Sequence, residues 1–238
     1  MYLLIVPEDY IYCYPTLFKI LKDKKIQKKI SGVIIKKKFF SFKKLIYHFL
    51  INDKFFLLDK FFNLNSQKNY FNKKFLEYKK INFYFTDHIN NKKTLKYIKN
   101  TGAKKLFIVS CDEILEENIV NYFNKAYNLH CSNLPKNRGL FPLFYSIINE
   151  DKFFYISIHE IDKNIDNGDI VIKKKYKLYT NSLTRLYEDV FNRVPGLFKE
   201  LIYKKKIKKI KNQFSKKTYN SYPSINNLIK FYYIKLFN

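Results

Sequence analysis

The sequence predicts an α/β protein in which helices flank a mostly parallel β-sheet. Short apolar runs rich in Ile, Leu and Val recur along the chain, and most are followed by a stretch with helical spacing of apolar residues. Strands that alternate with helices are typical of parallel sheets. With 238 residues, the chain is long enough for one sizeable domain. We expect a main domain over residues 1–179 and a small C-terminal extension, helical and partly irregular, packed on it over residues 180–238.

The N-terminal part predicts a strand, a helix and a second strand. The strands are expected at residues 2–6 and 30–35, and the helix at residues 15–24. Parallel pairing of the two strands through this helix gives a right-handed βαβ unit. No G-x-G-x-x-G follows the first strand, so the dinucleotide-binding fingerprint is absent.

Residues 39–76 alternate aromatic side chains with lysines. We expect helices at residues 42–50 and 71–79, with a break at residues 63–69. The rings are interpreted as a packing face with the lysines in water, and stacking of nucleic-acid bases on the rings is the alternative.

The remainder continues the alternation of strands and helices. Strands are expected at residues 81–85, 105–110, 153–158 and 170–179. Helices are expected at residues 90–101, with Gly102 as the C-terminal cap, and at 116–123, 141–149 and 183–203, the last interrupted near Pro195-Gly196. The lysine-rich residues 204–217 are interpreted as a solvated face, and the tail from 219 to 238 as irregular chain followed by a short helix.

The formal charge of +26 has two explanations. It comes from 46 Lys and Arg against 20 Asp and Glu, and Lys is far commoner than Arg. Abundant Lys, Asn, Ile, Phe and Tyr is the composition expected from codons rich in A and T, which we take as the main cause. Without an Arg-rich cluster or a known binding motif, nucleic acid is not the expected partner.

Three widely spaced cysteines, Cys13, Cys111 and Cys131, indicate neither a disulfide framework nor a zinc site. The first residues lack the features of a signal peptide, and no uncharged apolar run approaches the roughly 20 residues of a membrane helix. We therefore expect a soluble, cytoplasmic protein that does not bind membranes.

Residues 127–142 contain the strongest candidate for a site. Asn128 and His130 are two apart, so at the end of a strand both side chains lie on one face, and Pro135 and Gly139 then turn the chain. Ligands of open α/β sheets bind beyond the carboxyl ends of the strands.

A second polar segment, residues 159–169, contains an acidic loop with Asp166 and a glycine turn. If it lies at the same end of the sheet, Asn128, His130 and Asp166 converge. A nearby carboxylate favours the protonated imidazole, and together with the amide this set suits stabilisation of an oxyanion and relay of a proton. A structural histidine and a solvated turn are the alternatives. Metal binding and a Cys131–His130 pair are disfavoured by spacing and strand direction.

Residues 128–139 read Asn-Leu-His-Cys-Ser-Asn-Leu-Pro-Lys-Asn-Arg-Gly. They resemble the Asn-x-His-x-Ser-x-Leu-Pro-x-x-Arg-Gly signature of the folate-dependent formyltransferases. Residues 157–159 and 165–170 resemble that family's Thr-x-His segment and its Asp-x-Gly-Asp-Ile loop, in the same order and at the same separation. The resemblance implies a Rossmann-like formyltransferase fold.

The resemblance also implies roles for individual residues. Asn128, His130 and Asp166 match the catalytic residues, and N10-formyltetrahydrofolate is the implied formyl donor. Its pterin is expected against backbone groups of two loops, which contain Asp112, Glu113, Ile114 and Leu115 in one case and Asp162, Lys163 and Asp166 in the other. Ser132 and Arg138 are expected to shape the loop.

Departures from the family pattern narrow the range of possible acceptor amines. Pro7-Glu8-Asp9-Tyr10 is not the Gly-Ser-Asn phosphate cradle of the glycinamide ribonucleotide enzymes, and Tyr155-Ile156 replaces the usual Gly-Val. About sixty residues follow Tyr179, whereas methionyl-tRNA enzymes carry a further domain of about a hundred residues, typical of a small domain. The layout is closest to the sugar-nucleotide N-formyltransferases.

We therefore expect formyl transfer to a primary amine on a nucleotide-linked amino sugar, as in polysaccharide biosynthesis. Two alternatives remain open: a reduced enzyme that formylates methionyl-tRNA, and a non-catalytic relative that binds folate or a nucleotide. Exposed aromatic residues among the last sixty also suggest a homodimer.

Overall fold

The computed structural model of this protein describes residues 1–37, 42–54, 62–204, 206, 208–212 and 219–237. The chain divides into two compact units. The first contains Met1–Phe39, Phe62–Leu129 and Phe191–Lys205, and the second contains Phe40–Phe61, His130–Val190 and Lys206–Asn238. The boundary therefore falls inside strand β5 (Lys125–His130) and inside helix α9 (Leu183–Tyr203).

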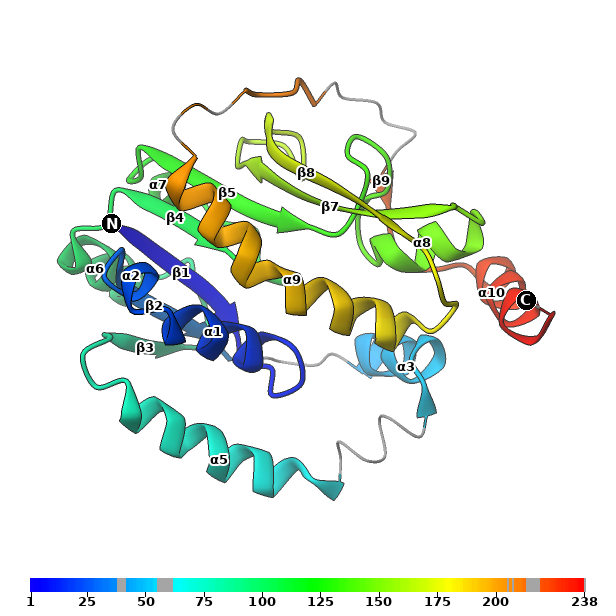
Figure 1. The fold of residues 1–238 in the computed structure, drawn as a ribbon, viewed down its shortest axis with the longest axis horizontal. Coiled ribbons are helices and arrows are strands. Elements are labelled where there is room, and N and C mark those ends of the chain that lie inside the picture. Colours follow the sequence, from blue (N-terminus) through cyan, green and yellow to red (C-terminus); the bar gives the residue numbers. More distant parts are fainter. Residues whose placement is uncertain (38–41, 55–61, 205, 207, 213–218, 238) are drawn as a thin grey trace. The chain divides into compact units, whose positions relative to one another are not determined.

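Five parallel strands form the sheet of the first unit, in the order β3-β2-β1-β4-β5 (Figure 1). Besides β5 they are β1 (Tyr2–Pro7), β2 (Ile30–Lys36), β3 (Phe83–Thr86) and β4 (Lys105–Ile108). Every residue of β1 is buried, as expected for a central parallel strand covered on both faces. The predicted fold class, a mostly parallel sheet flanked by helices, is confirmed.

Helices cover both faces of this sheet. They are α1 (Cys13–Lys22), α2 (Lys24–Gln27), α5 (Leu64–Glu77), α6 (Lys92–Thr101), α7 (Glu117–Val120) and the C-terminal part of α9. Phe198 of α9 stacks on Phe107 of β4 and meets the edge of Tyr2, with ring centroids 4.8 and 5.3 Å apart. Tyr97 of α6 stacks on Tyr84, which the strand register places on the opposite face.

Helix α5 shows that the expected break at residues 63–69 is wrong. The helix begins at Leu64 and runs to Glu77. Phe71 and Phe75, one turn apart, pack against Phe18 of α1 with ring centroids 5.8 and 5.1 Å away. This packing outweighs the weak helix propensity of the Asn and Ser residues before it. Phe71 and Phe75 confirm an aromatic packing face, whereas residues 38–41 and 55–61 lie outside the described residues.

Two other helices differ from expectation. Helix α9 is continuous through Pro195, because Val194 and Phe198 on either side are fully buried and their packing offsets the lost backbone bond. Helix α7 ends at Val120 rather than at residue 123, since the amides of Tyr122 and Phe123 bond three residues back, in tight turns. Gly102 caps α6 in the left-handed conformation, as predicted.

The second unit contains the strands and helices around the predicted polar loops. They are α3 (Phe42–Ile51), β6 (Arg138–Gly139), α8 (Pro142–Ile148), β7 (Phe153–Glu160), β8 (Ile170–Lys177), β9 (Tyr219–Asn220) and α10 (Ile225–Phe237). Strands β7 and β8 pair antiparallel, and β6 pairs with β9 in parallel. Phe144 of α8 packs on Phe231 of α10, with ring centroids 5.0 Å apart. None of the helices in the described residues is both long and apolar enough to cross a membrane.

Candidate active site

Strand β5 ends at His130, as predicted. Asn128 is half-buried and pairs opposite Ile108 of β4, and alternation along the strand places it on the same face as His130. His130 is only 7% exposed. Asn128 belongs to the first unit and His130 is the first residue of the second.

The loop after β5 fixes one nitrogen of the His130 ring. The Leu134-Pro135 peptide is cis, and Asn137 has a positive φ of 52°, a conformation that asparagine tolerates. The Asn137 carbonyl lies 2.9 Å from Nε2 of His130. Because a carbonyl can only accept, Nε2 carries a hydrogen, and Nδ1 is the nitrogen that gains or loses the second proton.

Asp166 lies between two histidines. Its Oδ2 is 3.6 Å from Nδ1 of His130, and its Oδ1 is 3.4 Å from Nε2 of His159. The backbone N–H of Gly139 donates to Oδ2 at 2.9 Å. The side chains of all three residues are at most 10% exposed. The structure therefore brings His130 and Asp166 together, although 36 positions separate them in the sequence.

Arg138 holds the segment that carries Asp166. Its guanidinium, 2% exposed, donates from Nε at 3.2 Å and from Nη2 to the carbonyl of Ile165. Asp166 itself has a positive φ of 50°. Aspartate adopts this left-handed conformation more readily than most residues other than glycine, but still at some cost, so contacts of the loop help to hold it. Arg138 thus shapes the loop, as expected from the sequence.

Gly168 allows the Asp166 loop, residues 161–169, to fold tightly onto β7. The N–H of Glu160 donates to the carbonyl of Asp169 at 2.9 Å, and a Cβ on Gly168 would overlap the Glu160 carbonyl. The backbone of Glu160 cannot move aside without breaking this pairing. A side chain at position 168 is therefore excluded.

We expect Gly168→Ala to destabilise the protein by about 1–3 kcal/mol, because the new methyl group must displace backbone. Gly196, in the interior of α9, is the matched control, since no atom lies within 4 Å of a Cβ placed there. Gly196→Ala should stabilise by about 0.5–1 kcal/mol. Urea unfolding of both variants measures these changes. Equal stability of Gly168→Ala and the wild type would contradict the close approach.

Burial and charge act in opposite directions on the two titratable groups. Burial lowers the pKa of His130 below its ordinary value and outweighs Asp166 and the Asn137 carbonyl, which raise it. Asp166 favours the protonated ring, as predicted, but desolvation disfavours it more, so the pKa of His130 is lowered overall. Burial raises the pKa of Asp166, but His130, His159 and the Gly139 N–H together hold it well below its usual range.

These pKa directions predict a loss of stability in acid. Both folded-state pKa values lie below the unfolded ones, so the unfolded chain binds more protons and the free energy of unfolding falls as pH falls. The loss begins below about pH 6.5, the ordinary pKa of histidine, and continues below about pH 4 for Asp166. Calorimetric Tm values between pH 8 and pH 4 test this. His130→Gln should flatten the plot of Tm against pH in the range where histidine titrates. Parallel plots for His130→Gln and the wild type would contradict the lowered pKa of His130.

The sequence analysis placed His159 at the start of the second polar segment but gave it no role in the site. Its Nδ1 donates to the Glu160 carbonyl at 2.7 Å, which directs Nε2 to Asp166. A register shift in the β7–β8 pairing after Ile158 leaves Val171 as an extra residue, the kind of bulge that re-aims side chains next to active sites. The signal for His159 in the sequence was alternation along the strand, because Ser157 and His159 are two apart and lie on one face. Ser157 is buried, and its hydroxyl donates to the Ser132 carbonyl at 2.7 Å.

Cys131 does not provide a nucleophile at ordinary pH. Burial, with a smaller effect of Asp166, raises the pKa of its thiol to about 12. Among the described residues, no three His, Cys, Asp or Glu side chains are grouped so that they could hold a metal ion. The arrangement therefore offers hydrogen-bond donors, one carboxylate and a proton acceptor.

The residues expected to meet the pterin lie in different units. In the first, Asp112 pairs with buried Lys36 at 3.7 Å, and Glu113 accepts from the amides of Ile89 and Asn90, both at 3.0 Å. The carboxylates of this loop thus bind its neighbours, and Ile114 is 70% exposed and Leu115 half-buried.

In the second unit, Asp162 accepts from the amide of Asn164 at 2.7 Å and from Nδ2 of Asn167 at 3.0 Å, and Lys163 is exposed. The Asp162 carboxylate thus organises the loop from within. Neither result tests the predicted backbone contacts to the pterin.

The structure is an α/β protein with an Asn-x-His pair at the end of one parallel strand. It also has a buried aspartate between two histidines, an arrangement suited to group transfer. The family described as formyl transferase matches residues 60–197, more than half of the chain. The chain belongs to this family.

The methionyl-tRNA formyltransferase of Finegoldia magna is 32% identical over 92 residues, which cover 38% of this chain and 30% of that protein. A sugar N-formyltransferase from Shewanella sp FDAARGOS_354 superposes with a TM-score of 0.56 at 18% identity, over 97% of this chain and 86% of the other. Phosphoribosylglycinamide formyltransferase from Bacillus halodurans superposes with a TM-score of 0.59 at 14% identity, over 87% of this chain and 97% of the other. The structural matches show the common fold. The chain spans a fifth to about a third of the length of the first curated relatives it matches.

Proposed function

We propose that this protein is a folate-dependent N-formyltransferase that moves a formyl group from N10-formyltetrahydrofolate to a primary amine. The observation that carries the proposal is the buried contact of Asp166 with His130, at 3.6 Å, beyond the end of β5. It supplies a proton acceptor next to a fixed negative charge, as acyl transfer to an amine requires. Membership of the formyl transferase family supports the same reaction.

The bound folate supplies an electrophilic formyl carbon, which the amine attacks. The amine becomes acidic as it forms the new C–N bond, and Nδ1 of neutral His130 takes the proton. Asp166 stabilises the resulting imidazolium. This charge and the amide N–H of Asn128 stabilise the negative charge that develops on the formyl oxygen. N10-formyltetrahydrofolate, when bound, would supply the formyl group, and the imidazolium of His130 would return its proton to the departing folate nitrogen.

The residues present fit this donor. Asp162 and Lys163 are exposed, so a ring with several hydrogen-bonding groups can approach this part of the loop. We propose that the pterin binds the backbone at Asp162 and Lys163, near Asp166, in the second unit. The loop of Asp112, Glu113, Ile114 and Leu115, in the first unit, is a separate proposal for backbone contact to the folate.

We propose an amino sugar linked to a nucleotide as the acceptor. The first loop disfavours a phosphoribosyl amine, because the amides of Ile11 and Tyr12 at the start of α1 already donate to the Asp9 carboxylate at 2.8 and 2.9 Å. Those amides are the groups that bind phosphate in a helix N-terminal cradle. Several solved structures with the same fold are described as sugar N-formyltransferases.

Methionyl-tRNA is the second candidate acceptor. It is favoured by the curated relatives that match this chain, several of which are methionyl-tRNA formyltransferases, and by the formal charge of +26. Binding that relies on phosphate contacts weakens steeply with salt. A non-catalytic relative is less well supported, because β7 pairs regularly with β8 through Tyr155 and Ile156 despite their departure from the family pattern.

The decisive experiment offers the protein N10-formyltetrahydrofolate with a panel of amino-sugar nucleotides, charged methionyl-tRNA and glycinamide ribonucleotide. Addition of one formyl group, read by mass, identifies the acceptor. Formylation of a sugar nucleotide supports the proposal, and exclusive, salt-sensitive formylation of tRNA replaces it by the second candidate. Folate binding without any product would indicate the non-catalytic relative.

A further inference from the structure

Asn212 lies in the lysine-rich segment that the sequence predicts to be a solvated face. It is only 6% exposed. Its Nδ2 donates to the carbonyl of Asp166 at 2.8 Å and to the carbonyl of Gly168 at 3.2 Å. Because carbonyl oxygens can only accept, the amide nitrogen must face them. Asn212 therefore binds the backbone of the same loop that carries the proposed catalytic carboxylate.

A short antiparallel contact explains how Asn212 reaches the loop. Ile210 and Ile170 exchange both backbone hydrogen bonds, each at 2.9 Å. In an antiparallel pair, the residue two positions after Ile210 lies opposite the residue two positions before Ile170, so Asn212 faces Gly168. Lys209 pairs with Glu160 at 2.5 Å and Lys211 with Asp169 at 3.7 Å. We call residues 208–212 the strap.

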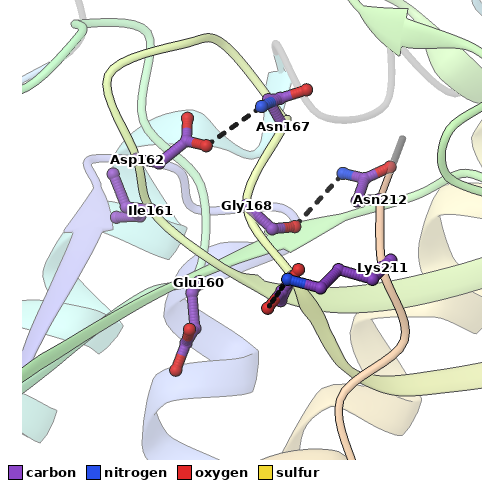
Figure 2. A pocket seen from close by; sticks show the side chains of 8 residues that line it. Glu160, Ile161, Asp162, Asn167, Gly168, Lys211 and Asn212 are labelled. Carbon is purple, nitrogen blue, oxygen red and sulfur yellow. Dashed lines mark hydrogen bonds and ion pairs between the residues drawn. The ribbon is translucent and has the colours of Figure 1, made fainter. Parts of the chain in front are cut away.

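The strap and the loop are not packed solidly against each other. A hollow of about 320 Å³ lies between them, lined by residues 160–162, 167–169, Lys211 and Asn212 (Figure 2). Figure 2 shows Asn212 reaching the Gly168 carbonyl on one side, while Asn167 reaches Asp162 on the other. Among the described residues, Oδ1 of Asn212 has no partner. The recorded hydrogen bonds of the Asn212 side chain are thus directed to the loop.

We propose that Asn212 is a positioning residue that holds Asp166 in its left-handed conformation, so that the carboxylate faces His130 and His159. The peptide group of Asp166 is fixed on both sides: Arg138 binds the carbonyl before it and Asn212 binds its own carbonyl. With both carbonyls held, rotation about φ and ψ of Asp166 is blocked, and the carboxylate stays on the Gly139 N–H. The role in catalysis rests on the proposed formyl transfer.

The first test measures the effect of Asn212 on Asp166 without an activity assay. The chain has only four histidines, so nitrogen NMR can follow His130 and His159 individually. The groups that face Asp166 include these two rings, the Gly139 N–H and the Cys131 thiol, and the Arg138 charge acts on His130. If Asn212→Ala loosens Asp166, the carboxylate no longer raises the pKa of His130, and its titration should shift down by about 0.5 unit or more. Asn226→Ala, at an exposed position of α10, is the matched control.

Asn212→Leu separates shape from hydrogen bonding, because leucine has a similar size but neither an N–H to donate nor a charge. It should shift the His130 titration as Asn212→Ala does, while the wild type and Asn226→Ala coincide. Unchanged titration of His130 in folded Asn212→Ala and Asn212→Leu would overturn the proposal. If the wild-type protein formylates no amine, this result still stands, so failure of the proposed function is distinguishable.

The second test uses turnover once an acceptor is known. Asn212→Ala should lower kcat by about tenfold or more, while the same change in an Asp166→Asn background should have little further effect, since Asn212 acts through Asp166. Single-turnover measurements can resolve the slow double variant. An equal loss in both backgrounds would show that Asn212 acts only on general stability, and would overturn the positioning role.

Discussion

Asp166→Asn should lower kcat for formyl transfer by about 10²–10³-fold. A charge pair about 4 Å apart interacts by ~4 kcal/mol at an effective dielectric constant of 20, an upper limit that corresponds to about three powers of ten in rate. The carboxylate lies 3.6 Å from Nδ1 of His130, the atom proposed to take the proton from the amine. Asparagine keeps the shape of aspartate and tolerates the left-handed conformation found at position 166.

The donor should still bind to the Asp166→Asn variant, because the pterin is proposed to contact backbone. Calorimetry with 5-formyltetrahydrofolate, a folate that does not transfer its formyl group in this way, should give a Kd within about threefold of the wild type, less than the effect of one typical hydrogen bond. Asp169→Asn is the matched control, since Asp169 lies in the same loop but pairs with exposed Lys211. Undiminished formylation by Asp166→Asn would remove Asp166 from the mechanism.

His130→Gln should lower kcat by about 10²–10⁴-fold, the usual range for loss of a positioned acid-base group. The glutamine amide can replace Nε2–H as the donor to the Asn137 carbonyl, but it has no atom that accepts a proton as Nδ1 does. The substitution therefore removes the proton acceptor while it keeps the contact that orients the side chain.

The pH profile gives the second readout for His130. Burial lowers its pKa, so the kcat/KM of the wild type should be constant above about pH 6.5 and fall only at lower pH, as the ring becomes protonated. The residual rate of His130→Gln should lack this fall. His48→Gln, in α3, is the control and should behave like the wild type. An acidic limb of unchanged position in His130→Gln would assign the proton acceptor to another group.

The site was predicted in part from the sequence. The two-residue spacing of Asn128 and His130 placed them on one face of β5, and the loop resemblance selected Asp166. His159 was within reach of the same reasoning, because it alternates with Ser157 on β7. Asn212 could not be predicted in this way, since nothing in a run of lysines indicates that one asparagine is buried.

The pairing of β6 with β9 was also beyond the sequence. Each strand has two residues, too few to show the period of two on which strand prediction depends. The left-handed turn at Asp166 has only a weak local signal, an aspartate two residues before a glycine. The contacts of this turn with Arg138 and Asn212, 28 and 46 positions away, were beyond the sequence.

The sequence by itself determined the fold class, the strand that ends in Asn-x-His and the identity of the acidic loop, because these depend on periodicity and on residues close together along the chain. The tertiary structure decided that burial lowers the pKa of His130 overall, that His159 and Asn212 contact Asp166, and that α9 continues through Pro195. These outcomes depend on burial and on contacts between distant residues, which no local pattern specifies.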